Sequence, residues 1–272
     1  MEQELTSRPR IVFLSSGGIL GDIVLRRLLE SGQFDVAGIV RSRRVMLRGA
    51  GFLRGAIAYF ARCGIIYTVY IWTITTFAEF VGLFTGIGSI TRRARENNIP
   101  VLHAQDVNER CGQEFIAACR PDLLVSAHFD QRLDPPLCDR HGLAAVNIHP
   151  SLLPDHRGLE PVLHTMRRGG SAFGVTVHRI AVQIDTGMAV AAAELAADKS
   201  DSVLRVTRDL MKTGADLLVA HTEQAHHPGT SSPQERTGSY HSWPSGPDIA
   251  QLYRTGRHLM KPRDFAFLWR KT

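Results

Sequence analysis

The stretch IVFLSSGGILGDIVLRRLLESG, residues 11–32, points most directly to the fold. Its first four residues form an apolar run, which predicts a short buried strand. A glycine-bearing turn, SSGGILGD, follows, and the apolar spacing from Ile23 onwards is that of a helix ending near Ser31 and Gly32. A strand, a turn and a helix in this order form the first half of a unit that builds parallel sheets.

Strand-like runs recur along the chain with helical stretches between several of them. They lie at residues 34–40, from Val101 and Leu102 onwards, at 122–126 (DLLVS), at 144–148 (AAVNI) and at 173–180 (FGVTVHRI). Strands that alternate with helices are typical of a parallel α/β sheet. We therefore expect a Rossmann-like, mostly parallel sheet with helices on both faces.

The glycines of SSGGILGD do not form a dinucleotide-binding fingerprint. Ser16 stands where GxGxxG would need its first glycine if Gly18 and Gly21 filled the other two positions. A nicotinamide cofactor is therefore not indicated. The turn fits either a plain strand-to-helix connection, which we favour, or a contact with phosphate or another anion at the helix N-terminus.

The composition is that of a folded globular protein. Of 272 residues, 44% are hydrophobic and 21% are charged, which argues against disorder over most of the length. The formal charge of +6 comes mostly from scattered Lys and Arg residues, so small anionic ligands are favoured over nucleic acid. The basic residues gather only at Arg41, Arg43, Arg44, Arg48 and Arg54.

The cysteines and the N-terminal segment bear on the compartment. Cys63, Cys111, Cys119 and Cys138 form neither a CxxC pair nor a zinc-finger spacing. The segment MEQELTSRPR is too polar for a signal peptide. A reducing cytoplasm is therefore the expected location. No His, Cys or Asp cluster has metal-ligand spacing, so we predict no metal.

Residues 41–90 depart from the surrounding pattern and are predicted to be an insertion. A basic start, RSRRVMLRGAGFLRG, leads into the apolar and aromatic run CGIIYTVYIWTITTFAEFVGLF. Its uncharged part, residues 64–78, is shorter than the roughly 20 apolar residues that a spanning helix needs. A transmembrane span is disfavoured. The insertion is expected to form a pocket wall or a homodimer interface, and an interfacial membrane contact remains the alternative.

The C-terminal part is expected to hold one long helix and then a linker. Residues 202–221 carry an apolar stripe at helical spacing, with Ser200 or Asp201 available as the N-cap. The segment AHHPGTSSPQERTGSY, residues 225–240, is rich in Pro, Gly and Ser and predicts an exposed loop. We expect a catalytic domain over residues 1–222 and a linker with a C-terminal extension over residues 223–272.

Polar side chains gather where apolar strands end in two consecutive segments. These are AAVNIHPSLLPDHRGLEPVLHTMRRGG, residues 144–170, and SAFGVTVHRIAVQIDTGMAVA, residues 171–191. Asn147 lies at the end of one strand, His149 lies just beyond it, and a short loop after the next strand presents Asp185. Ligands bind at the carboxyl ends of strands in parallel sheets, so these three residues are candidates for chemistry.

The two segments resemble the formyltransferase family that uses N10-formyltetrahydrofolate. The resemblance lies in NIHPSLLP at residues 147–154, the Arg157 and Gly158 that follow, GVTVH at 174–178 and IDTG at 184–187. Upstream, PDLLVSAHFDQRL resembles the family's folate-contacting loop, although the family commonly has a small residue, often glycine, at the position of His128. The similarity covers about residues 10–40 and 101–194.

The resemblance implies a set of site residues. Its catalytic residues would be Asn147, His149 and Asp185. The other implied contacts are Phe129, Arg132, Leu133 and Ile184 for the folate cosubstrate, and Ser151, Arg157 and Gly158 for the acceptor. His156, His164 and His178 are interpreted as loop, helix and strand residues, with His178 allowed a place near the site.

Formyl transfer needs the chemistry that these residue types supply. An amine attacks the formyl carbon, so the oxygen of the tetrahedral intermediate becomes negative and needs a donor. Asn147 can donate through its amide and His149 can donate when protonated. An imidazole can also take the proton that the amine must lose, and Asp185 can orient that ring, raise its pKa or hold a relaying water.

The acceptor is predicted from the insertion and the C-terminal tail. The tail GSYHSWPSGPDIAQLYRTGRHL, residues 238–259, resembles a segment of formyltransferases that modify small amines. The expected acceptor is a primary amine or hydroxylamine on a sugar nucleotide, an amino acid or a natural-product precursor. Two alternatives stay open: a formyltetrahydrofolate hydrolase, and a membrane- or partner-associated protein that works through its apolar insertion.

Overall fold

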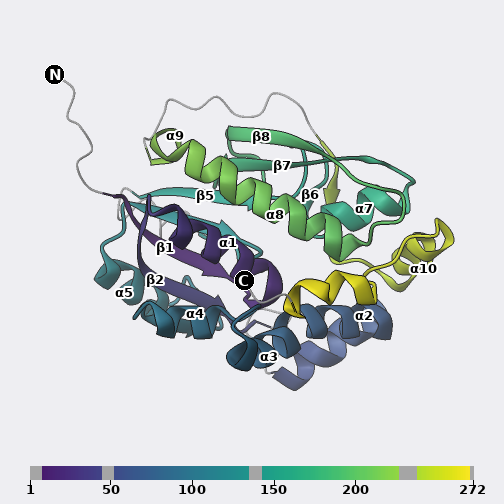
Figure 1. Ribbon diagram of the computed structural model, residues 1–272, viewed down its shortest axis with the longest axis horizontal. Helices are drawn as coiled ribbons and strands as arrows, with labels where there is room; N and C mark the ends of the chain where they lie inside the picture. Colours follow the sequence, from purple (N-terminus) through teal and green to yellow (C-terminus); the bar gives the residue numbers. More distant parts are fainter. Residues whose placement is uncertain (1–7, 45–51, 135–142, 227–237, 270–272) are drawn as a thin grey trace.

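The computed structural model describes residues 8–44, 52–134, 143–226 and 238–269. Its main sheet has seven strands in the order β3-β2-β1-β4-β5-β7-β8 (Figure 1). The strands are β1 (Arg10–Ser15), β2 (Asp35–Ser42), β3 (Val101–Ala104), β4 (Leu123–Ala127), β5 (Ala144–His149), β7 (Ala172–Arg179) and β8 (Ala189–Ala196). The first five pair in parallel and the last two pair antiparallel, which confirms the expected mostly parallel sheet.

Helices cover both faces of this sheet, as the Rossmann-like pattern predicts. Alternate residues of β1 enter two separate cores: Ile11 and Phe13 pack into one, and Val12 and Leu14 into the other. The first core lies under α1 (Gly18–Ser31) and α8 (Val203–Ala220), and the second under α5 (Arg110–Cys119). Figure 1 shows α1 and α8 side by side across the sheet.

Three local expectations need correction. Helix α1 begins at Gly18, so the second half of the glycine turn is already helical. The N-cap of α8 is Ser202, whose side chain accepts from the backbone N–H of Arg205, and neither Ser200 nor Asp201 has this position. Strand β8 was not predicted from the sequence, because its many alanines give no clear alternation of apolar and polar side chains.

The insertion folds as a bent helical segment. It comprises α2 (Phe52–Trp72), η1 (Thr73–Phe77), α3 (Ala78–Thr85) and the following α4 (Ile90–Glu96). The backbone is non-helical at Gly64, which has φ 76° and ψ 169°, so α2 turns there. By length and composition alone, the helical segment Arg54–Glu96 could cross a membrane, although 28% of its most apolar stretch is buried in the protein.

Glu79 ties this insertion to the glycine turn. Its carboxylate is buried and accepts from the backbone N–H groups of Gly18, at the start of α1, and of Thr91, in the first turn of α4. Burial opposes the charge, but Arg41 and the N–H donors outweigh it and lower the pKa of Glu79. The N-terminus of α1 therefore does contact an anion, and that anion is the chain's own side chain.

The C-terminal segment returns to the sheet end. Strand β9 (Tyr240–His241) pairs in parallel with β6 (Arg157–Gly158), and α10 (Gly246–Arg254) packs against α7 (Pro161–Arg167) and α2. The loop expected over residues 225–240 is therefore partly wrong: its first two residues end α9 (Thr222–His226) and its last begins β9. Residues 227–237 lie outside the described part, as do Arg48 and Cys138.

Candidate active site

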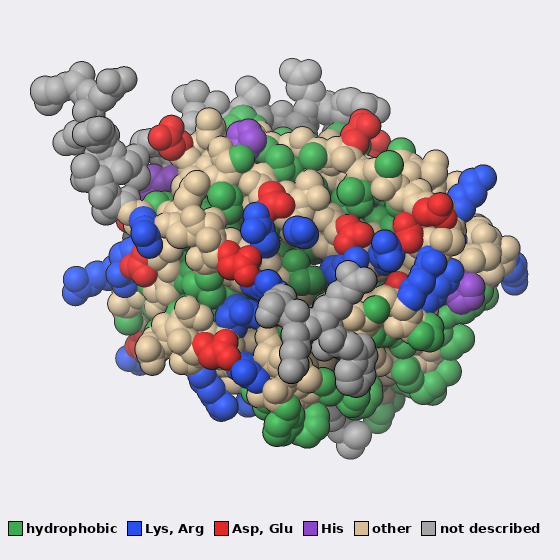
Figure 2. All heavy atoms as spheres, in the orientation of Figure 1, with side chains coloured by type: hydrophobic (Ala, Val, Ile, Leu, Met, Phe, Trp, Pro, Cys, Tyr) green, Lys and Arg blue, Asp and Glu red, His purple; other side chains and the backbone are tan. Residues whose placement is uncertain are grey.

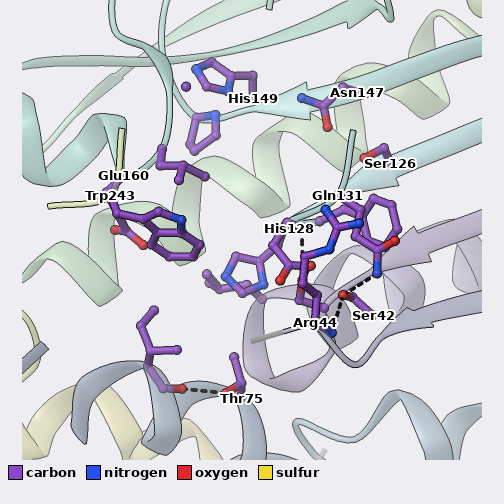
Figure 3. A pocket seen from close by; sticks show the side chains of 18 of the residues that line it. Ser42, Arg44, Thr75, Ser126, His128, Gln131, Asn147, His149, Glu160 and Trp243 are labelled. Atoms are coloured by element: carbon purple, nitrogen blue, oxygen red, sulfur yellow. Dashed lines mark hydrogen bonds between the residues drawn. The ribbon is translucent and has the colours of Figure 1, made fainter. Parts of the chain in front are cut away.

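A cavity of about 1030 Å³ lies at the carboxyl ends of the parallel strands. Three parts of the chain line it: the sheet with its loops, the insertion, and the C-terminal segment through Tyr240 and Trp243. Figure 3 shows Arg44, Ser42 and Gln131 on one side of the cavity, with Glu160 and Trp243 on the other. His149 and Asn147 lie at the end of β5 above this space (Figure 3).

Asp185 connects the loop after β7 to two histidines. Its Oδ2 lies 3.5 Å from Nδ1 of His149, and its Oδ1 lies 3.4 Å from Nε2 of His178. The backbone N–H of Gly158 donates to Oδ2 at 2.8 Å. Asp185 has φ 54°, a left-handed conformation that a non-glycine residue adopts at a cost, so the surrounding structure holds this carboxylate in place.

Burial and charge set the protonation of this pair. Burial penalises the Asp185 carboxylate, but His149, His178 and the Gly158 N–H outweigh it and hold the pKa of Asp185 well below its ordinary value. Burial is the main effect on His149 and lowers its pKa despite the opposing influence of Asp185. At neutral pH the site therefore combines an ionised Asp185 with a neutral imidazole.

Both ring nitrogens of His149 face acceptor oxygens. Nε2 lies 3.0 Å from the backbone carbonyl of His156, and Nδ1 faces the Asp185 carboxylate. A neutral ring carries one N–H and can donate to only one of them. A protonated ring donates to both, so these contacts favour the imidazolium that forms when His149 accepts a proton.

His178 holds the side chain of Asn147. The antiparallel register of β5 and β7 places the two residues opposite each other, and Nδ2 of Asn147 lies 3.2 Å from Nε2 of His178. Nδ1 of His178 lies 2.8 Å from the backbone carbonyl of Arg179 and donates to it. Nε2 of His178 also lies 3.4 Å from Oδ1 of Asp185, so this nitrogen lies between the Asn147 amide and the Asp185 carboxylate. Sequence reasoning interpreted His178 mainly as a strand residue and missed this contact.

The four residues predicted to contact the cosubstrate all line the cavity. Phe129 and Leu133 also pack against the second core, so they form an apolar wall. Arg132 forms an ion pair with Asp134 at 3.3 Å, and Ile184 is 43% exposed. A flat heterocycle with an anionic tail fits apolar side chains beside cationic ones. Their contact with folate remains a prediction.

His128 occupies the position where the resembled family commonly has a small residue, often glycine. Its φ of 49° is in the left-handed region, which glycine adopts without strain. Its ring lines the cavity, and burial among neighbouring atoms lowers its pKa to about 4, so the ring is neutral at physiological pH. The backbone at His128 therefore has a conformation that favours glycine, and the imidazole forms part of the cavity wall.

Of the three residues predicted to contact the acceptor, only one lines the cavity in the structure. Gly158 lines the cavity, and Ser151 and Arg157 are absent from its lining. The Ser151 hydroxyl donates to the carbonyl of Asp155, and Arg157 donates to the carbonyl of Gly238 in the C-terminal segment. In this structure Ser151 and Arg157 hold the loop and the tail in place, and their contact with an acceptor remains a prediction.

Sequence reasoning did not single out Glu160. This residue precedes α7, has φ 53° and lines the cavity, and its Oε1 accepts from the buried hydroxyl of Tyr67 at 2.8 Å. Burial raises the pKa of Glu160 despite that hydrogen bond. Tyr67 belongs to the insertion, and nothing local in the sequence signals a contact across 93 positions.

Aromatic residues of the insertion and the tail meet at the same wall. The rings of Tyr59 and Trp243 are 5.2 Å apart in an edge-to-face arrangement, and Tyr59 stacks on Tyr67 at 6.0 Å. The insertion is thus a wall of the cavity, one of the alternatives that the sequence left open. Among the described residues, no group of three His, Cys, Asp or Glu side chains is arranged to hold a metal ion.

Part of the chain is similar in sequence to known formyltransferases. The family model for formyl transferase matches residues 88–222. The methionyl-tRNA formyltransferase of Bacillus licheniformis is 34% identical over 129 residues, which are 47% of this chain and 41% of that protein. The chain thus spans less than half the length of this relative.

Solved structures share the fold at low sequence identity. A sugar N-formyltransferase from Shewanella sp has a TM-score of 0.56 at 16% identity, covering 93% of this chain and 89% of the other. A sugar 3N-formyl transferase determined in the presence of dTDP and 5-N-formyl-THF has a TM-score of 0.53 at 16% identity, with 87% and 70% covered. The sheet therefore shares its fold with these formyltransferases. Residues 88–222, just under half of the chain, match the formyl transferase family.

Proposed function

We propose that this protein transfers a formyl group from N10-formyltetrahydrofolate to a primary amine or hydroxylamine of a small-molecule acceptor. The observation that carries the proposal is the pair of contacts that Asp185 makes with His149 and His178 at the end of a large cavity. The family match over residues 88–222 supports the reaction class. The structural relative determined with 5-N-formyl-THF supports folate as the formyl carrier.

In the proposed reaction, Asn147, His149 and Asp185 have different roles. The acceptor nitrogen forms a bond to the formyl carbon, and the Asn147 amide donates to the oxygen as it becomes negative. His149 takes the proton that the nitrogen loses, and the ionised Asp185 stabilises the resulting imidazolium. The bond from the formyl carbon to N10 then breaks, N10 keeps the electron pair and receives the proton held by His149, and the ring returns to its neutral form.

We assign acceptor binding to the side of the cavity that is formed by the insertion and the C-terminal tail. Glu160 offers a carboxylate, and Tyr59 and Trp243 offer aromatic faces, a combination that suits an amine on a ring or a short chain. Arg44 and Arg132 lie among the lining residues and suit the anionic groups of a folate tail or a sugar phosphate. We propose a small amine, such as one carried by a sugar nucleotide or an amino acid.

Formyl transfer is tested by incubating the purified full chain with N10-formyltetrahydrofolate and a panel of amines. The expected result is a mass increase of one formyl group on an amine, with release of tetrahydrofolate at an equal rate. Rapid release of formate without any amine would instead establish the hydrolase. His149→Ala, run in parallel, separates enzymatic transfer from spontaneous reaction, because only the enzymatic part is lost.

A further inference from the structure

Nine of the thirteen large apolar side chains that are exposed in the described residues lie between Ile57 and Phe84. We call these nine side chains the outer face of the insertion. They include Phe60, Trp72, Phe80 and Phe84, and Phe84 is 73% exposed. Figure 2 shows apolar side chains gathered along the lower and lower-right edge of the molecule, over α2 and α3. Such a contiguous patch is unusual on a protein that contacts only water.

The inner side of the same segment is anchored in the protein. Tyr67, Tyr70 and Ile74 are at most 1% exposed, and the Tyr67 hydroxyl donates to Glu160. A bilayer-spanning orientation would remove these side chains from the core and break that hydrogen bond. The segment therefore lies along the body of the protein with one side buried and the other presented outward.

Within residues 41–95, which include the outer face, nearly all charged side chains are basic. Glu79 is the sole acidic residue between positions 41 and 95, and it is 5% exposed and engaged by backbone N–H groups. Arg54 and Arg62, by contrast, are exposed on α2. The helices that carry the outer face thus combine its apolar and aromatic side chains with exposed arginines, and the one carboxylate of α2 and α3, that of Glu79, is buried.

We infer that the outer face binds the surface of an anionic lipid bilayer. Apolar and aromatic side chains enter the interfacial region, and the arginines meet lipid phosphates. A second copy of the chain fits less well, because a twofold contact places the same patch on both partners and leaves Arg54 and Arg62 without acidic partners. Trp72 belongs to the outer face and also lines the cavity, so the bound protein keeps one edge of its cavity at the lipid surface.

Flotation of the purified full chain with lipid vesicles tests the inference. Vesicles of phosphatidylcholine with an equal share of phosphatidylglycerol should carry the wild type, and vesicles of phosphatidylcholine alone should carry much less. The double variant Phe80→Ser/Phe84→Ser should lower the bound fraction by about tenfold or more. Arg54→Glu/Arg62→Glu should lose the preference for anionic vesicles. Tyr253→Ser, at an exposed aromatic residue on α10, is the matched control and should bind like wild type.

Circular dichroism and thermal melting verify that each variant is folded. Absence of wild-type binding to anionic vesicles overturns the inference, and so does unchanged binding of the folded phenylalanine variant. A wild-type dimer in light scattering that Phe80→Ser/Phe84→Ser converts to a monomer also overturns it and assigns the face to a second copy. None of these outcomes depends on formyl transfer, so failure of the proposed function is measured separately.

Discussion

The carboxylate of Asp185 lies 3.5 Å from His149, and the same group lies 3.4 Å from His178. One side chain on a loop therefore fixes two imidazoles on neighbouring strands. If this arrangement carries out formyl transfer, His149→Ala and Asp185→Asn should each lower turnover by orders of magnitude. Stopped assays with saturating substrates measure the loss, and circular dichroism verifies the fold. Near-normal turnover in either folded variant contradicts the assigned chemistry.

The loss of turnover at acid pH should reflect protonation of His149. The ring acts as a base only when neutral, so turnover is present above its pKa and is lost as the pH falls through it. Burial lowers the pKa of His149, so the acid limb of kcat/KM, which reflects groups of the free enzyme, should lie below pH 6.5. In Asp185→Asn the charge that favours imidazolium is gone, and the residual activity should show its limb at still lower pH. A limb that moves upward in this variant is inconsistent with the mechanism.

Glu160→Gln should weaken acceptor binding selectively. The change keeps the shape and removes the negative charge, so the KM for the amine should rise on the order of tenfold, as expected for a charged hydrogen bond worth about 1.5 kcal/mol. The KM for N10-formyltetrahydrofolate should not change. Tyr67→Phe removes the hydrogen bond that lowers the pKa of Glu160 but keeps the carboxyl group, and it should have a smaller effect. Equal changes in both KM values would argue against an acceptor contact.

Gly158→Ala should separate the C-terminal strand from the site loop. A Cβ at this position would clash with the backbone oxygen of His241, and φ is +91°. We expect a loss of about 1–3 kcal/mol in the free energy of unfolding, together with lower turnover because the Gly158 N–H holds Asp185. Urea denaturation measures the first effect. Gly246→Ala, where a Cβ meets nothing within 4 Å, is the matched control and should be nearly neutral.

Local pattern was sufficient for most of the parallel sheet. Runs such as LLV, residues 123–125, are apolar at consecutive positions because the strand is buried on both faces, and this pattern is recognised without knowledge of the neighbouring strands. Strand β8 escaped prediction because it is an edge strand built largely of alanine, for which neither spacing nor side-chain size is informative. The membrane argument was also local, and it did not include the bend at Gly64, which allows the apolar segment to lie along the protein.

The residues of the candidate site likewise fall into those that local sequence predicts and those whose contacts depend on tertiary structure. Asn147, His149 and Asp185 could be proposed from contiguous motifs, since each lies at the end of a predicted strand or in the short loop that follows one. Glu160 and His178 could not be assigned contacts, because their partners depend on how distant segments meet. The hydrogen bond from Tyr67 to Glu160 spans 93 positions, and no periodicity encodes it.

By itself, the sequence determined the α/β class and the order of the parallel strands along the chain, and it motivated the proposal of formyl transfer. These properties depend on short-range apolar spacing and on motifs only a few residues long. Only the tertiary structure decided that Asp185 joins two histidines, that the tail completes the cavity wall, and that the insertion presents an apolar face outward. Those arrangements follow from strand order and from long-range packing, in which residues far apart in sequence become neighbours when the sheet assembles.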